Sequence, residues 1–171
     1  MMMHHDMLGI YLNDHLAGAT LGVGLARHVA YRHRRSVRGS SLEQIADEIA
    51  EDRQSLLRIM DKLGVPARRY KMCVGWAAER MRRLKPNGVT HRSSGLDTVM
   101  ELETLRLGVE GKSLLWLTLL ELAPGRTDLD ESQLKDLLDR ARNQLGALEE
   151  LRRTAAATFF SLQDVQASAG Q

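Results

Sequence analysis

The stretch from Leu96 to Leu122 constrains the fold of this chain more than any other part of the sequence. Its residues, LDTVMELETLRLGVEGKSLLWLTLLEL, carry apolar side chains at helical spacing on two faces. A helix that is apolar around most of its circumference is buried among other helices. The charged residues in its middle, Glu103, Arg106, Glu110 and Lys112, then need partners or a function. The sequence therefore predicts a helix bundle and directs the search for a site to this helix.

The composition indicates a helical interior. Hydrophobic residues make up 43% of the 171 residues and aromatic residues only 4%. Leucine, alanine and methionine must therefore fill the core, which suits packed helices better than a β-sandwich. The single cysteine, Cys73, excludes an intramolecular disulfide framework. No apolar run is long enough to span a membrane, and the N-terminal residues lack the apolar region of a signal peptide. We expect a cytoplasmic protein that does not bind membranes.

Four further segments carry apolar residues at helical spacing. They lie at about 8–34, 41–63, 67–84 and 130–160. Ser41 and Gln44 predict a capping box at the start of the second helix, and Gly64 predicts its end. Gly18, Gly22 and Gly24 lower the helix propensity of the first helix, so we expect them to permit the close approach of a neighbouring helix or subunit.

The order of these helices predicts the fold class. Short connections make the first two and the last two helices antiparallel neighbours, and a long crossover makes the middle pair parallel. The chain is therefore expected to be a single all-α domain over residues 1–171, an up-down four-helix bundle with one long crossover. The bundle core is expected at 8–160, the crossover with an extra short helix at 65–95, and a flexible tail at 161–171.

The helix order and the segment LEQIADEIAEDRQSLLRIMDKLG resemble the ferritin-like superfamily. The resemblance covers residues 8–160 and is greatest to small, stress-associated bacterial members with an extra helix in the connection. It implies a ferritin-like bundle, whose di-iron members place carboxylates and Glu-x-x-His motifs inward. No Glu-x-x-His motif occurs in a long helix of this chain.

Four other residues could form a metal site. Asp52 keeps helical spacing with the apolar stripe of its helix, and Glu103 and Glu110 do so with Leu96, Met100, Leu107, Leu114 and Leu117. We therefore expect these carboxylates to face the core, where they would meet His15. Such a set could bind iron, manganese or zinc.

A structural ion-pair network is the interpretation that we favour. Arg106 lies one helical turn from Glu103 and from Glu110, and Arg53 and Lys112 lie close to the same positions. The predicted network contains Arg53, Glu103, Arg106, Glu110 and Lys112. We expect such a buried or half-buried network to fix the register of the helices.

Two clusters of basic residues lie at the end of the first long helix and after the second. They contain Arg27, Arg32, Arg34, Arg35, Arg38, Arg68, Arg69, Arg80, Arg82 and Arg83. If both clusters share one surface, they could bind nucleic acid. Few aromatic residues accompany them, so we favour a solvated face or an acidic protein partner.

No sequence motif indicates a catalytic site. The function that the sequence predicts is a non-catalytic bundle that self-associates, first of all as a homodimer, or binds a protein partner. A divergent metal-carboxylate protein is the first alternative, and a nucleic-acid-binding protein is the second.

Overall fold

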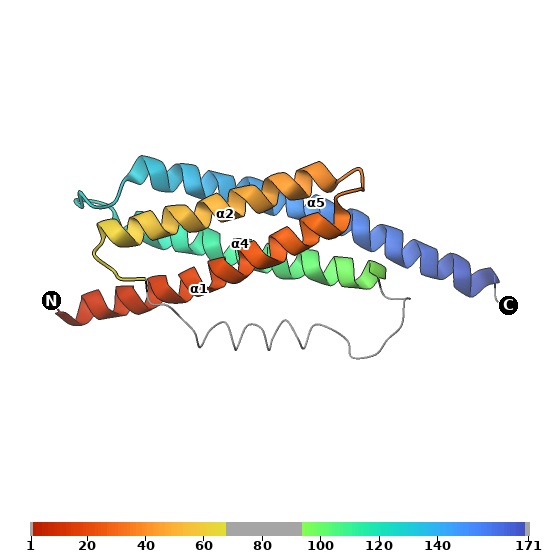
Figure 1. Ribbon diagram of the computed structural model, residues 1–171, viewed down its shortest axis with the longest axis horizontal. Coiled ribbons are helices and arrows are strands. Elements are labelled where there is room, and N and C mark those ends of the chain that lie inside the picture. The colour runs from red at the N-terminus through yellow and green to blue at the C-terminus, as the bar shows by residue number, and fades with distance from the viewer. Residues whose placement is uncertain (1, 68–93, 170–171) are drawn as a thin grey trace.

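The computed structural model describes residues 2–67 and 94–169 of the chain (Figure 1). They form the helices α1 (Met2–His33), α2 (Gly39–Lys62), α4 (Ser94–Leu122) and α5 (Glu131–Ala169). The described residues contain no strand, so the predicted all-α class is confirmed. The short helix predicted at 67–84, which includes Cys73, lies outside the described residues.

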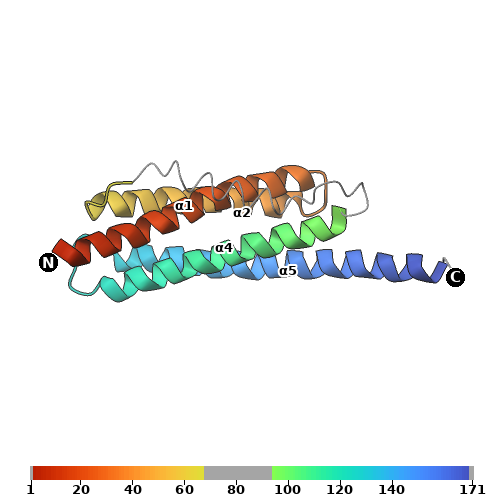
Figure 2. The same cartoon turned by 90° about the horizontal axis from the view of Figure 1, so that it is seen from below.

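The four helices form an elongated bundle of two antiparallel hairpins. One hairpin joins α1 to α2 and the other joins α4 to α5 (Figures 1 and 2). In Figure 1, α2 ends and α4 begins at opposite ends of the bundle, so these two helices run in the same direction. Helix α1 packs against both α2 and α4, and α4 packs against α5. Helices α2 and α4 therefore face one another across the interior.

The apolar stripe of α2 lies in the core, as its sequence predicts. Its members Leu42, Ile45, Ile49, Leu56, Ile59 and Leu63 are all buried. The helix ends at Lys62, and Gly64 follows with φ +66°, a left-handed conformation that glycine adopts without steric cost. The predicted C-terminal end of this helix is confirmed.

The start of α2 differs from the predicted capping box. The helix begins at Gly39, and no side chain caps its N-terminus. The Gln44 side chain instead donates a hydrogen bond to Glu48 Oε1 (2.8 Å). The cause is a tight connection, in which the Gly39 amide donates to the Ser36 carbonyl (2.9 Å) and starts the helix before Ser41. The capping-box prediction is therefore wrong.

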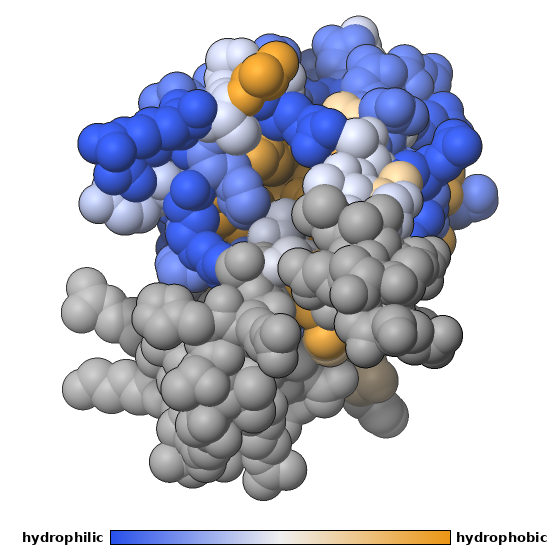
Figure 3. All heavy atoms as spheres, turned by 90° about the vertical axis from the view of Figure 1, so that its right-hand side faces the viewer, coloured by the Kyte–Doolittle hydropathy of each residue, from blue (hydrophilic) through white to orange (hydrophobic). Residues whose placement is uncertain are grey.

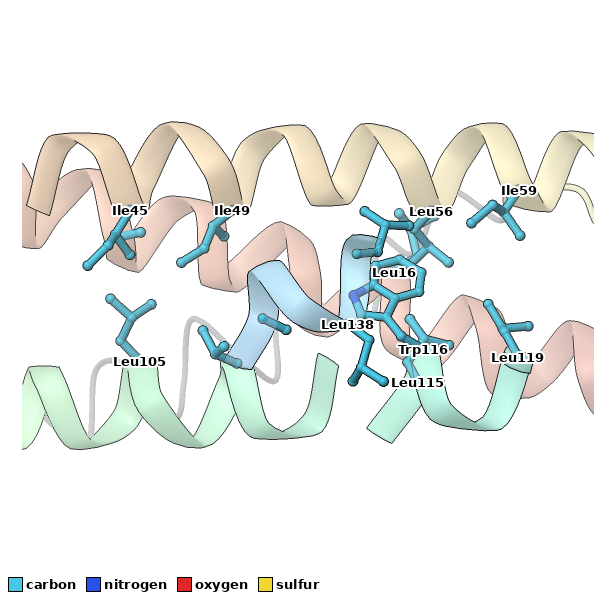
Figure 4. Close-up of a cluster of buried hydrophobic side chains, with 14 of the residues drawn as sticks. Leu16, Ile45, Ile49, Leu56, Ile59, Leu105, Leu115, Trp116, Leu119 and Leu138 are labelled. Atoms are coloured by element: carbon cyan, nitrogen blue, oxygen red, sulfur yellow. The ribbon is translucent and has the colours of Figure 1, made fainter. Parts of the chain in front are cut away.

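All four helices contribute to one hydrophobic core. Figure 4 shows Leu16 of α1, Leu56 of α2, Trp116 of α4 and Leu138 of α5 gathered between the ribbons. Trp116 is the largest fully buried side chain among the described residues and is 1% exposed. Burial of one such large apolar side chain stabilises a fold by about 1.5–3 kcal/mol. The end view in Figure 3 shows hydrophilic residues around the outside and hydrophobic residues between them.

Helix α4 buries the opposite face from the one that we expected. The core contains Val99, Leu102, Leu105, Val109, Leu115, Trp116 and Leu119. The predicted inward residues Leu96, Met100, Leu107, Leu114 and Leu117 are instead 39%, 45%, 68%, 54% and 38% exposed. We call these five residues the α4 stripe.

The prediction that Glu103 faces the core is therefore wrong, whereas Glu110 is half-buried. The Glu103 side chain is 49% exposed. The buried face of α4 carries one charged residue, Lys112, whereas the α4 stripe has two glutamates between its apolar residues. Burying one partnered charge costs less free energy than burying two carboxylates. This difference favours burial of the face that carries Lys112, because both faces are otherwise apolar.

Helix α5 is longer than predicted. It continues to Ala169, past the end expected near Phe160, and its last part extends beyond the other three helices (Figures 1 and 2). Phe160 on this part is 55% exposed. The residues expected to form a flexible tail are thus helical as far as Ala169.

Candidate functional site

Three polar side chains meet inside the bundle. Lys112 of α4 donates one hydrogen bond to Asp52 Oδ2 of α2 and another to Gln144 Oε1 of α5 (2.6 Å). Asp52 and Gln144 are each 1% exposed. The Gln144 amide also donates to Glu48 Oε2 (3.0 Å) and reaches Asp52 Oδ2 (3.4 Å). These contacts join α2, α4 and α5 at one level, with Glu48 at the outer edge.

Arg140 supplies the second positive charge of this cluster. Its Nη2 lies 2.8 Å from Asp52 Oδ1, and its Nη1 lies 2.9 Å from Glu51 Oε2. Asp52 Oδ1 has no hydrogen bond of good geometry from a described residue, so its contact with Arg140 is chiefly electrostatic. The Asp52 carboxylate therefore lies between two cations, Lys112 and Arg140. We call Asp52, Lys112, Arg140 and Gln144 the central cluster.

Burial opposes the charge on Lys112. Its side chain is 12% exposed, and removal of the ammonium from water lowers its pKa, an effect that the Asp52 carboxylate partly reverses. Breaking a buried pair by removal of one partner is strongly destabilising, although the intact pair need not stabilise the fold. The central cluster can thus hold three helices together without performing chemistry.

The residues of the predicted ion-pair network do not form one network but have partners at different sites in the bundle. Lys112 belongs to the central cluster, while Arg53 donates a hydrogen bond to Thr20 Oγ1 of α1 (2.9 Å). Arg106 lies 3.3 Å from Glu149, and Glu103 lies 3.7 Å from Arg152. Both pairs join α4 to α5 at the surface, because the predicted face of α4 points outward. The prediction that Arg106 pairs with Glu103 and Glu110 is therefore wrong.

Sequence reasoning did not assign Arg140 and Gln144 to the network. Gln144 lies between Ala141 and Leu148, both 0% exposed, on the apolar stripe of α5. A polar residue at helical spacing within an apolar stripe was the available signal. Nothing in the sequence gives a comparable signal for Arg140, which lies at the edge of that stripe.

A cavity of about 320 Å³ adjoins the central cluster between α1, α2 and α4. It is lined by Asp14, His15, Gly18, Ala19, Ile49, Asp52, Arg53, Leu56, Gly108, Gly111, Lys112, Leu115 and Trp116. A Cβ atom added at Gly18, Gly108 or Gly111 would meet nothing within 4 Å. These glycines border open space. The neighbouring helix expected close to Gly18 and Gly24 is not found in the described part of the chain, whereas a Cβ atom added at Gly22 would lie 4.0 Å from the Ile49 side chain.

The four candidate metal ligands do not converge. His15 and Asp52 line the cavity, and burial lowers the His15 pKa. Glu103 lies about 180° around the axis of α4 from Lys112, which faces Asp52. Within 2–67 and 94–169, no group of three or more His, Cys, Asp or Glu residues is placed to hold a metal ion. Binding of iron, manganese or zinc stays a prediction, and the described residues supply no set of ligands for it.

The basic residues of the first cluster surround the connection from α1 to α2. Arg27, Arg34, Arg35 and Arg38 are exposed there. Arg32 is engaged with Glu101 of α4 (2.6 Å), and the Arg34 guanidinium lies 4.0 Å from the centre of the Tyr31 ring. Arg68, Arg69, Arg80, Arg82 and Arg83 lie outside the described residues. A shared nucleic-acid surface therefore stays a prediction.

Comparison of the chain with protein-family models, with curated proteins and with solved structures gives no significant match in any of the three. Among the described helices, none is long and apolar enough to cross a membrane.

Proposed function

We propose that this protein is a self-associating helical bundle that forms a homodimer through the α4 stripe. The observation that carries the proposal is the exposure of the stripe along α4. Its central residue, Leu107, is 68% exposed. Exposed apolar residues that follow one face of a helix at heptad spacing are typical of surfaces that pack against another helix.

The stripe is symmetric in sequence, which favours a second copy of this chain as its partner. Met100 and Leu114 each lie seven residues from Leu107, and Leu96 and Leu117 lie eleven and ten residues from it. In an antiparallel pairing about a twofold axis at Leu107, Met100 would meet Leu114 of the second copy. A twofold interface uses the same patch on both subunits, so this patch must be complementary to itself.

The two glutamates beside the stripe favour the antiparallel direction. In a parallel pairing, Glu103 and Glu110 would each meet the same glutamate of the second copy, and like charges repel. In the antiparallel pairing, Glu103 would lie opposite Gly111 and Glu110 opposite Thr104. The glycine leaves room for the close approach of two helices.

We further propose that the bundle has the ferritin-like arrangement. This is supported by the common direction of α2 and α4 and by the length of chain between them. We do not extend the proposal to metal chemistry, because Glu103 lies on the opposite side of α4 from Lys112, which contacts Asp52. The cytoplasmic location of the protein stays a prediction.

The molar mass in solution tests the proposal. We expect the wild-type protein to have the mass of a dimer in analytical ultracentrifugation and the Leu107→Glu variant to have that of a monomer. Met7→Glu is the matched control, since Met7 is 66% exposed and belongs to a different helix, α1. This control should remain dimeric, and circular dichroism should show that all three proteins are folded. A monomeric wild-type protein, or a dimeric Leu107→Glu variant, would overturn the proposal.

A further inference from the structure

We infer that the cavity between α1, α2 and α4 binds a small, mostly apolar molecule that carries a carbonyl or carboxylate oxygen. The volume of about 320 Å³ is at the lower end of the range that ligand sites occupy, roughly 300–1,000 Å³. Ile49, Leu56 and Leu115 give it apolar walls. All the residues that line the site belong to one copy of the chain, and Gly111 on its wall also borders the proposed dimer contact.

Trp116 lines this cavity and carries an unused hydrogen-bond donor. The residue is 1% exposed, and its indole Nε1 has no acceptor among the described residues. In Figure 4, the indole nitrogen points along the bundle toward the level between Ile49 and Leu56, and both of these residues line the cavity. Buried donors are almost always paired in folded proteins, so an unpaired one at a cavity indicates a missing acceptor.

Lys112 brings a second donor to the same cavity. An ammonium group has three N–H donors. Two of them are used by Asp52 and Gln144, and the third has no acceptor among the described residues. Two donors beside one apolar space favour a ligand that carries an acceptor oxygen.

The acidic groups at the cavity do not favour a cation instead. Asp52 already lies between Lys112 and Arg140, so its charge is compensated within the central cluster. Arg53 lies on the cavity wall and Asp14 is exposed at its edge, which leaves the lining close to neutral. A neutral carbonyl and a carboxylate share the required chemistry, and the experiment below distinguishes them.

Three probes with the same heavy-atom skeleton test the inference. Acetophenone carries a neutral carbonyl, benzoate carries a carboxylate, and cumene carries no acceptor. Isothermal titration calorimetry should show that the wild-type protein binds acetophenone or benzoate at least tenfold more tightly than cumene. The tighter of the two identifies the form of the oxygen. Trp116→Phe, which keeps an aromatic ring and removes the N–H donor, should reduce this preference at least threefold, because Lys112 remains as the second donor, and should still bind cumene.

A cavity-filling variant tests the location. Gly18→Leu should abolish binding of all three probes, because Gly18 lines the cavity and its added side chain would occupy open space. Gly24→Leu on the same helix is the matched control: Gly24 also has nothing within 4 Å but does not line the cavity, so binding should be unchanged.

Absence of binding by the wild-type protein would overturn the inference, and so would equal affinities for the three probes. An unchanged preference in a folded Trp116→Phe variant would also overturn it. If that variant does not fold, Gly18→Leu decides, and wild-type binding by Gly18→Leu would show that the probes bind elsewhere.

Discussion

Lys112 of α4 donates a hydrogen bond to Asp52 of α2 across the interior of the bundle. Asp52 is 1% exposed, and among the described residues it is the only ionisable one that is fully buried. Its other charged neighbour, Arg140, comes from α5. One carboxylate thus connects three of the four described helices, and its removal leaves Lys112 without a carboxylate partner and Arg140 with Glu51 alone.

Substitutions in the central cluster should have unequal costs. Asp52→Leu should lower the free energy of unfolding by about 3–5 kcal/mol, because it leaves Lys112 without a carboxylate partner and Arg140 with Glu51 alone. Lys112→Met should cost less, about 1–3 kcal/mol, since Asp52 keeps Arg140 and Gln144. The double variant should cost less than the sum of the two single variants, because the residues interact directly. Urea denaturation of the four proteins measures these differences.

The surface pair of Lys135 with Glu131 (3.4 Å) is the control for this cycle. The Lys135 side chain is 64% exposed, so Lys135→Met should change stability by no more than about 0.5 kcal/mol. Strict additivity of Asp52→Leu and Lys112→Met would contradict the coupling that the structure indicates.

Two glycine-to-alanine substitutions should change stability in opposite directions. A Cβ at Gly39 would lie 2.8 Å from the Arg34 carbonyl oxygen and 2.9 Å from that of His33. Backbone atoms cannot move aside cheaply, so Gly39→Ala should destabilise the fold by about 1–3 kcal/mol. Gly24→Ala in the middle of α1 meets nothing within 4 Å and should stabilise by up to about 1 kcal/mol. Thermal denaturation of both variants checks the signs, and equal melting temperatures would refute the close contact at Gly39.

A pair of introduced charges should show whether the two α4 helices of the proposed dimer are antiparallel or parallel. Met100→Glu and Leu114→Lys should each weaken the dimer, because each places a charge in the α4 stripe. The double variant should dimerise again if the helices are antiparallel, since the glutamate introduced at position 100 would then face the lysine introduced at position 114 of the second copy. In a parallel dimer, like charges would meet and the double variant would remain monomeric. Analytical ultracentrifugation at equal concentrations separates these outcomes.

Stability should fall as the pH decreases below neutrality. Burial lowers the His15 pKa from 6.5, and burial and Arg32 lower that of His33. As the pH falls through about 6.5, the unfolded chain binds protons at these residues that the folded chain does not. The free energy of unfolding therefore decreases until the pH reaches the lower folded pKa and is constant with respect to these groups below it.

The histidine variants show which residues cause this decrease. Urea denaturation at pH 7.5 and 5.5 should give a smaller loss of stability for His15→Asn and for His33→Asn than for the wild-type protein. If both variants lose as much stability as the wild-type protein, the decrease has another cause.

The sequence predicts the long helices well because their apolar residues recur at helical spacing. The stripe from Leu42 to Leu63 has one apolar face, so its inward side follows directly, and Asp52 on that face is buried as expected. Helix α4 has two apolar faces, and periodicity alone does not decide which of them is buried. The choice depends on Asp52 of α2 and Gln144 of α5, which accept hydrogen bonds from Lys112 of α4.

The site was predicted only in part for the same reason. Lys112 and Asp52 were both identified, but in different groups, because their contact joins residues far apart in the sequence. Glu103 and Arg106 were expected to pair along one helix, yet their partners are Arg152 and Glu149 on α5. Pairing within a helix can be inferred from spacing, whereas pairing between helices requires their rotation to be known.

The two-faced character of α4 has a consequence for insertions and deletions. One residue inserted between Leu102 and Leu107 would turn the remainder of the helix by about 100°. Such a turn would carry Lys112 away from Asp52 and move Trp116 toward solvent. The connection at 123–130, which lies between α4 and α5, can absorb an added residue without turning either helix. Insertions and deletions should therefore be tolerated in the connection after α4, whereas the same changes within α4 should destabilise the fold.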